Sequence, residues 1–280
     1  MSNSPAGHVV GSTVRPNYET GSRTPLRTFL TTADGISIDS VYDPSAAVYD
    51  SSAPPGGHLV FVMAHGFTGD VDRPHVRRVV DALARYGAVV TFSFRGHGRS
   101  GGRSTVGDRE VLDLAAAVEW AREVEPHARV VTVGFSMGGS VVLRHAALHT
   151  GTVGAVVSVS APARWYYRGT VQMRRVHWLI TRPEGRLLGR FGFRTRIHHR
   201  GWDPVPLSPT EAVPRIAPTP LLIVHGDRDG YFPLDHPRML AEAAGDHGEL
   251  WVEPGMGHAE QAADDALLAR MGDWAASRAG

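Results

Sequence analysis

Cysteine and lysine are both absent from this chain of 280 residues. Without cysteine, disulfide bonds and thiolate metal sites are excluded. All basic side chains other than histidine are arginines, and the 29 basic residues nearly balance the 28 acidic ones. The formal net charge of +1 provides no general attraction to nucleic acids or membrane surfaces. The composition therefore predicts no nucleic-acid partner.

Long hydrophobic runs are also missing. No apolar segment approaches the roughly 20 residues of a transmembrane helix, and residues 1–24 lack the apolar core of a signal peptide. This first segment is rich in Ser, Gly, Thr and Pro, so we predict a flexible N-terminal tail over residues 1–24. We also expect no stable membrane insertion and a cytoplasmic location.

Short apolar runs alternate with helical patterns along the rest of the chain. Two opening strands flank the turn signal at residues 33–35, and six later runs have the continuous apolar character of strands buried on both faces. The pattern predicts an α/β fold in which helices cover both faces of a mostly parallel sheet. The expected strands are 27–32, 36–42, 58–64, 88–94, 129–135, 155–160, 221–225 and 249–252, and the expected helices are 71–86, 111–124, 137–149, 234–244 and 259–276.

One segment interrupts this alternation, since no strand is expected between residues 160 and 221. Residues 161–216 hold 11 arginines against three acids, with several aromatic residues and a helical stretch near 170–180. An insertion of this length usually serves function, for example as a lid over a binding site. We predict a core of residues 25–160 and 219–280, and a lid of residues 161–218.

The segment GFSMG, residues 134–138, stands between an expected strand and an expected helix. G-x-S-x-G in this context is typical of a nucleophile elbow, a sharp turn that gives its serine a positive φ and lifts the side chain above the sheet edge. Gly134 and Gly138 are expected because a Cβ would clash where the two backbones pass closely. The helix N-terminus would direct free amides toward charge beside Ser136. A glycine-rich turn with an incidental serine is the alternative.

Two later loops carry the other groups that a nucleophilic serine requires. A serine hydroxyl needs a base to take its proton, and His258 lies in a glycine-rich loop between the last strand and the last helix. The base needs a buried acid that orients it. Asp227 and Asp229 both follow the strand at 221–225, and either could serve.

Acyl transfer further needs two N–H donors for the developing oxyanion. The amide of Met137, directly after the serine, would be one, and the amide of Phe67 in the loop HGFTG would be the other. We interpret His65 in this loop as a structural histidine. His97 and the three arginines near it could form an anion site.

The order of Ser136, an acid and His258 resembles that of the α/β-hydrolase fold family. The segments HGFTG, FRGHGRSGG, GFSMGG, HGDRDGYFP and GMGHAE follow the family's order and spacing, and the resemblance covers the chain from about residue 27. It is greatest to carboxylesterases, monoacylglycerol-lipase-like hydrolases and peptidase-like hydrolases. The resemblance implies that Asp229 rather than Asp227 is the acid, and that the insertion after the sixth strand of the core is a lid. It also implies that the loop with His97 is a structural turn beside the pocket, and we prefer this interpretation to an anion site.

The resemblance implies a serine hydrolase that needs no cofactor, with Ser136, Asp229 and His258 as catalytic triad and the amides of Phe67 and Met137 as oxyanion hole. We expect a small-molecule acyl substrate with an ester or thioester bond, because alkoxide and thiolate leave more readily than amine. The alternatives are a peptidase, C–C hydrolase or perhydrolase of this fold, or a ligand-binding protein without activity. The presence of all three triad residues favours an enzyme.

The inserted segment departs from the family's lids in its arginine content, so the resemblance implies no particular substrate. Its aromatic residues could line an acyl pocket while its arginines receive an anionic group; alternatively, the arginines pair with the acidic surface of the core or face water. No metal site is expected, because the tandem His198-His199 lacks a carboxylate pair or a third spaced histidine. The candidate substrate-binding residues are Arg164, Trp165, Tyr166, Arg168 and Trp178.

Overall fold

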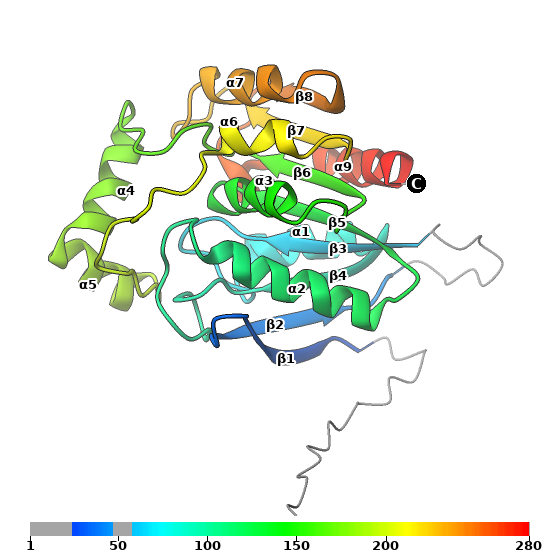
Figure 1. The fold of residues 1–280 in the computed structure, drawn as a ribbon, viewed down its shortest axis with the longest axis horizontal. Coiled ribbons are helices and arrows are strands. Elements are labelled where there is room, and N and C mark those ends of the chain that lie inside the picture. Colours follow the sequence, from blue (N-terminus) through cyan, green and yellow to red (C-terminus); the bar gives the residue numbers. More distant parts are fainter. Residues whose placement is uncertain (1–23, 47–57, 280) are drawn as a thin grey trace, which may run out of the picture.

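A computed structural model describes residues 24–46 and 58–279 of the chain (Figure 1). Apart from Thr24, the tail predicted over residues 1–24 lies outside the described residues. At the centre is one eight-stranded sheet. Its strands are β1 (Leu26–Thr31), β2 (Ser37–Asp43), β3 (Leu59–Ala64), β4 (Gly87–Phe92), β5 (Arg129–Phe135), β6 (Ala155–Val159), β7 (Leu221–Gly226) and β8 (Gly248–Glu253).

The strand order across the sheet is β1-β2-β4-β3-β5-β6-β7-β8. β1 pairs antiparallel with β2, and β2 pairs antiparallel with β4. All later neighbours are parallel. The opening hairpin and the mostly parallel sheet expected from the sequence are thus confirmed. Because β3, β5, β7 and β8 run in one direction, the loops after these strands meet at one edge of the sheet.

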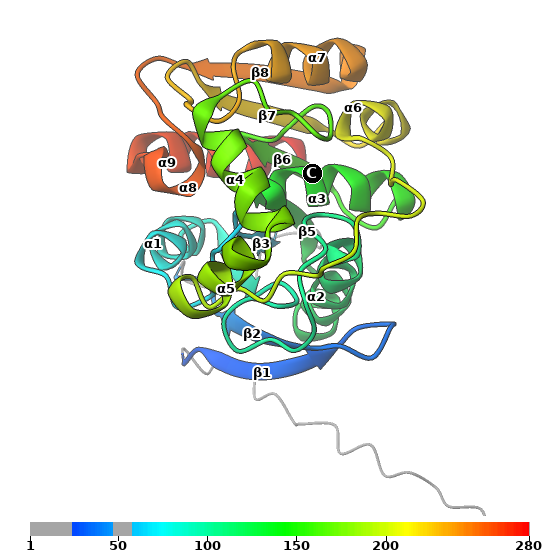
Figure 2. The same cartoon turned by 90° about the vertical axis from the view of Figure 1, so that its left-hand side faces the viewer.

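Helices cover both faces of this sheet (Figures 1 and 2). The helices are α1 (Pro74–Leu83), α2 (Glu110–Val124), α3 (Met137–Leu148), α4 (Val171–Thr181), α5 (Pro183–Gly192), α6 (Pro209–Ala212), α7 (Asp235–Ala244), α8 (Ala259–Ala262) and α9 (Asp265–Arg278). One buried apolar cluster joins the sheet to α2, α3 and α7, and a second joins its other face to α1 and α9. The continuous apolar character of the strands therefore reflects burial on both faces.

Two helices differ from their expected ranges by more than one residue. α1 begins at Pro74 instead of residue 71, since proline is favoured in the first turn, where its missing N–H costs nothing. The single helix expected over 259–276 is divided into α8 and α9. The side chain of Asp264 accepts the amide of Leu267 at 2.8 Å and so caps the start of α9. None of the helices within 24–46 and 58–279 is both long and apolar enough to span a membrane.

Residues 161–218, which we call the inserted segment, carry α4 and α5 past the edge of the sheet where the strands end (Figures 1 and 2). The helical stretch expected near 170–180 is α4, whereas α5 was not expected. Pro183 starts α5 after an extended Arg182. At Gly185 the two helices approach so closely that a Cβ would lie 2.5 Å from the carbonyl oxygen of Trp178. The two helices therefore pack directly against each other.

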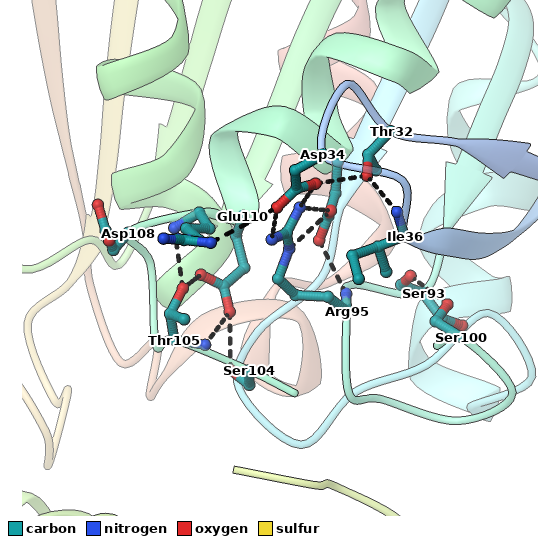
Figure 3. A network of polar contacts seen from close by, with 12 residues as sticks. Thr32, Asp34, Ile36, Ser93, Arg95, Ser100, Ser104, Thr105, Asp108 and Glu110 are labelled. Atoms are coloured by element: carbon teal, nitrogen blue, oxygen red, sulfur yellow. Dashed lines mark hydrogen bonds and ion pairs between the residues drawn. The ribbon is translucent and has the colours of Figure 1, made fainter. Parts of the chain in front are cut away.

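The loop that follows β4, residues 93–104, is fixed by buried charges (Figure 3). The Arg95 side chain is 3% exposed and forms ion pairs with Asp34 at 2.7 Å and with Asp113 at 2.8 Å. The carboxylate of Glu110 accepts hydrogen bonds from the amides and hydroxyls of residues 104–107. His97 is fully buried. These contacts favour a structural role for Arg95 and His97 over a role in anion binding.

Burial lowers the pKa of four histidines, to about 3 for His65 and His145 and to about 4 for His97 and His236. An unfolded histidine titrates near 6.5. Below that pH the unfolded chain binds protons that the folded chain does not, so the free energy of unfolding decreases as the pH falls from about 6.5 toward about 4. Each histidine contributes up to about 1.4 kcal/mol per pH unit. We expect urea unfolding to give a lower free energy of unfolding at pH 5 than at pH 7.5. Equal values at the two pH values would contradict the lowered pKa of these histidines.

Candidate active site

The turn between β5 and α3 has the geometry of the predicted elbow. Ser136 stands between these elements with φ of 51° and ψ of −112°. A Cβ on Gly134 would lie 2.2 Å from the carbonyl oxygen of Gly138, and one on Gly138 would lie 2.2 Å from that of Ala64. Only glycine fits at either position. The strained backbone of Ser136 therefore projects its side chain beyond the end of the sheet.

Ser136 is joined by hydrogen bonds to groups from two other loops. Its Oγ lies 2.8 Å from Nε2 of His258, and Nδ1 of His258 lies 2.7 Å from Oδ2 of Asp229. Asp229 belongs to the loop after β7, and His258 to the loop after β8. Asp227 is exposed and accepts the amide of Gly255 at 2.6 Å. The residues alone left open whether Asp227 or Asp229 orients the histidine. In the structure Asp229, and not Asp227, is hydrogen-bonded to His258.

The Asp229 carboxylate is 1% exposed and accepts hydrogen bonds from three groups, one of which is His258. Its Oδ1 accepts the amides of Tyr231 at 2.7 Å and Phe232 at 3.1 Å, while Nε2 of His225 lies 3.5 Å from Oδ2. Burial alone would raise the pKa of Asp229, but the hydrogen bond and charge of His258, with the other donors, hold this pKa below its usual value. An ionised Asp229 accepts the Nδ1–H of His258, which leaves Nε2 free to take a proton from Ser136.

The imidazole of His258 is also held by packing. The ring of Tyr231 stacks on it with centroids 4.1 Å apart. The next residue, Ala259, has a positive φ of 56° and donates its amide to Oγ of Ser160 at 3.1 Å. Sequence reasoning missed both supports. Tyr231 could have been noticed as an aromatic residue two positions after the acid, but no sequence pattern marks Ser160.

Glu260 is a further residue that sequence reasoning missed. Its side chain is buried, and Oε1 accepts the amide of Gly66 at 3.0 Å. A Cβ on Gly66 would lie 3.1 Å from this oxygen. Nε2 of His75 lies 3.9 Å from the same carboxylate. Since Gly66 directly precedes Phe67, Glu260 links the loop of the candidate base to the loop of the candidate oxyanion donor.

The loop after β3 is fixed from its other side by His65. This side chain is fully buried, its Nδ1 lies 2.7 Å from the carbonyl oxygen of Gly66, and its Nε2 lies 3.1 Å from the amide of Phe94. A neutral imidazole with its proton on Nδ1 satisfies both contacts. These contacts support the structural role expected for His65, because the ring joins two loops and does not approach Ser136.

A cavity of about 840 Å³ lies above Ser136 and extends under the inserted segment. Phe67 and Met137, the candidate oxyanion donors, line it together with Ser136 and His258. Its remaining walls include many aromatic and aliphatic side chains of the inserted segment and of the loop after β7, together with arginine, histidine and small polar side chains. All five residues expected to bind substrate line this cavity: Arg164, Trp165, Tyr166, Arg168 and Trp178.

These five residues differ in their other contacts. Trp165 donates from Nε1 to the carbonyl of Pro206 at 2.9 Å, and Trp178 is 46% exposed. Arg164 forms an ion pair with Asp235 of α7 at 2.7 Å. For this arginine the structure therefore favours the alternative weighed from the sequence, in which it pairs with an acid of the core.

The histidine pair in the inserted segment forms a stacked contact, with the rings of His198 and His199 5.0 Å apart. Across residues 24–46 and 58–279, no three His, Asp or Glu side chains are grouped so that they could hold a metal ion. The described site is thus built from the hydroxyl, imidazole and carboxylate groups above and from backbone amides.

Comparison with known proteins agrees with this architecture. The family model of the α/β hydrolase fold matches residues 60–173. A monoacylglycerol lipase of Mycolicibacterium smegmatis is 27% identical over 251 residues, which cover 75% of this chain and 85% of the relative. An esterase structure from Pyrococcus furiosus has a TM-score of 0.69 at 23% identity, covering 92% of this chain and 93% of that one. An α/β hydrolase from Penicillium sp. sh18 has a TM-score of 0.69 at 19% identity, with 91% and 99% covered.

The link between Glu260 and Gly66 leads to a first prediction for the site. Glu260→Ala should lower kcat for ester hydrolysis by about ten- to a hundredfold with a smaller change in KM, because the oxyanion loop loses a buried acceptor. Glu260→Gln retains an oxygen acceptor and should restore most of kcat. Steady-state kinetics on p-nitrophenyl butyrate at pH 7.5 measures both variants. Equal loss in the two variants, or a change confined to KM, would contradict this positioning role.

Proposed function

We propose that this chain, an esterase- or lipase-like member of the α/β-hydrolase fold family, hydrolyses carboxylic esters of apolar acids through an acyl-enzyme on Ser136. The observation that carries this proposal is the hydrogen-bonded series of Ser136, His258 and Asp229, of which Ser136 and His258 line the cavity. A nucleophile, a base and an acid in this geometry are the groups that acyl transfer requires.

In the proposed reaction, Oγ of Ser136 attacks the ester carbonyl carbon while Nε2 of His258 takes the hydroxyl proton. The new C–O bond places negative charge on the former carbonyl oxygen, and the amides of Phe67 and Met137 donate hydrogen bonds to it. Asp229 remains ionised and stabilises the imidazolium through Nδ1–H. His258 then donates the proton to the leaving alkoxide, so an alcohol departs and the acyl group stays on Ser136.

Deacylation repeats these steps with water. His258 takes a proton from a water molecule, whose oxygen attacks the acyl carbon. The tetrahedral intermediate collapses, the carboxylic acid leaves, and the proton returns to Oγ of Ser136. The proposed roles thus restore every group of the site to its initial protonation state.

The walls of the cavity support an apolar acyl group as the substrate's acid part. Aromatic and aliphatic side chains prevail along the inserted segment, which we propose to act as a lid. A relative bears the name monoacylglycerol lipase, and a structural neighbour is called an esterase; we therefore propose an oxygen ester in preference to a thioester or an amide. The cytoplasmic location expected from the sequence stays a prediction.

The proposed nucleophile can be tested by removing the Oγ atom of Ser136. Ser136→Ala should lower kcat on p-nitrophenyl esters of graded acyl length by more than about a thousandfold, because the remaining groups cannot form the acyl-enzyme. A fluorophosphonate probe should label the wild-type protein on Ser136 and leave the variant unlabelled. Circular dichroism serves as the control for folding. Turnover or labelling of the variant at the wild-type level would overturn the assignment.

The two aspartates of the loop after β7 offer a matched pair of variants. Asp229→Asn should reduce kcat by about three to four orders of magnitude, because an amide oriented toward Nδ1 favours the wrong imidazole tautomer. Asp227→Asn removes the same charge two residues away and should leave kcat within about threefold, since the one hydrogen bond described for its side chain is to a backbone amide of the neighbouring loop. Steady-state kinetics on one ester decides between them. A larger loss in Asp227→Asn would assign the acid to Asp227.

A further inference from the structure

A second groove, separate from the catalytic cavity, lies along α5. It encloses about 280 Å³ and is walled by α5, by the chain just after it, and by the loop that follows β4. Four of its seven lining residues are arginines, the other three are apolar, and none is acidic. The lining residues are Arg103, Pro183, Arg186, Leu187, Arg190, Arg196 and Ile197.

The arginines of this groove differ from most arginines of the core in their partners. Core arginines such as Arg77 and Arg95 are paired with carboxylates at 2.6 to 2.8 Å. Among the described residues, none of the four groove arginines forms an ion pair. Arg186 donates to the carbonyls of Ile180 and Thr181, and Arg196 donates to that of Ser100. Carbonyls satisfy hydrogen bonds but do not neutralise charge, so four positive charges remain uncompensated around one groove.

One nitrogen among the four groove arginines lacks a hydrogen-bond partner. Nε of Arg196 is buried and has no hydrogen-bond acceptor within the described part of the chain. Leaving a buried charged donor unpaired costs free energy, as does holding like charges together. A bound anion would relieve both costs, and guanidinium groups suit the oxygen geometry of phosphate.

We propose that this groove binds a phosphate ester whose organic part is apolar. The guanidinium groups would surround the phosphate, and Pro183, Leu187 and Ile197 would contact the carbon part. Leu187 is 58% exposed, and Phe191 on the same helix is 75% exposed, so apolar surface continues beyond the groove. The phosphate could belong to a phospholipid headgroup or to a soluble organic phosphate. The groove holds none of the proposed catalytic residues, so the proposal is independent of the ester-cleaving function.

Binding to the full chain tests the proposal with two probes. One arm uses isothermal titration calorimetry with 1-naphthyl phosphate and, for comparison, 1-naphthol. The other uses flotation with phosphatidylcholine vesicles that contain or lack phosphatidylglycerol. We expect the phosphate-bearing probe of at least one arm to bind, its neutral counterpart to bind much more weakly, and affinity to fall as salt is raised. Binding of 1-naphthyl phosphate would identify a soluble organic phosphate as the ligand, and binding of phosphatidylglycerol vesicles would identify a phospholipid headgroup.

A double variant locates the binding. Arg103→Gln/Arg190→Gln should weaken binding by about tenfold or more and leave hydrolysis of a neutral p-nitrophenyl ester unchanged, since neither side chain has a described hydrogen bond to lose. Arg85→Gln/Arg238→Gln removes the same charge from exposed positions outside the groove and serves as the matched control. Absence of binding in both arms would overturn the proposal. So would equal weakening by the two double variants, which would indicate general charge attraction.

Discussion

The close approach of three backbones at Ser136 is the constraint on which the rest of the site depends. α3 passes so near to β5 and to the end of β3 that Gly134 and Gly138 have no room for a Cβ. This contact forces the positive φ of Ser136 and directs its hydroxyl out of the sheet. It also brings the loop after β3 beside the first turn of α3, and Phe67 and Met137 of these two segments line the same cavity. The backbone conformation of the candidate nucleophile and the proximity of these two segments thus have one steric cause.

The other groups reach Ser136 because parallel strands end at a common edge, but their precise placement comes from contacts between loops. Asp229 is held by two amides of its own loop, and His258 by the ring of Tyr231. The chain after His258 is fixed in turn by Glu260, which binds Gly66, and by Arg78 of α1, which donates to the carbonyls of Glu260 and Ala263. The break between α8 and α9 therefore helps to hold the candidate base His258, since an uninterrupted helix would place these carbonyls in its own hydrogen bonds.

Arginine has two distinct uses in this lysine-free chain. In the core it binds carboxylates, as Arg95 does with Asp34 and Asp113 under the loop after β4. In the inserted segment, the pair between Arg164 and Asp235 ties the segment to α7, whereas the arginines along α5 meet carbonyls or face the second groove. A planar guanidinium can cap helix carbonyls and remain charged, so a segment rich in arginine can be ordered and still keep a positive surface. Arginine is thus in excess over acids only in the insertion, because the rest of the chain holds more acids than arginines.

The sequence by itself determined the features that depend on local patterns. Runs of buried β-branched residues predicted the strands, and glycines around Ser136 predicted the elbow, because both are set by neighbours along the chain. The residues alone left Asp227 and Asp229 open, since both follow the same strand. Tertiary structure decided the contacts of these two acids, the extra helix α5, and the supports from Ser160 and Glu260. These depend on packing between segments that lie as many as 194 residues apart, as in the bond from Glu260 to Gly66, and no local pattern encodes which loops meet.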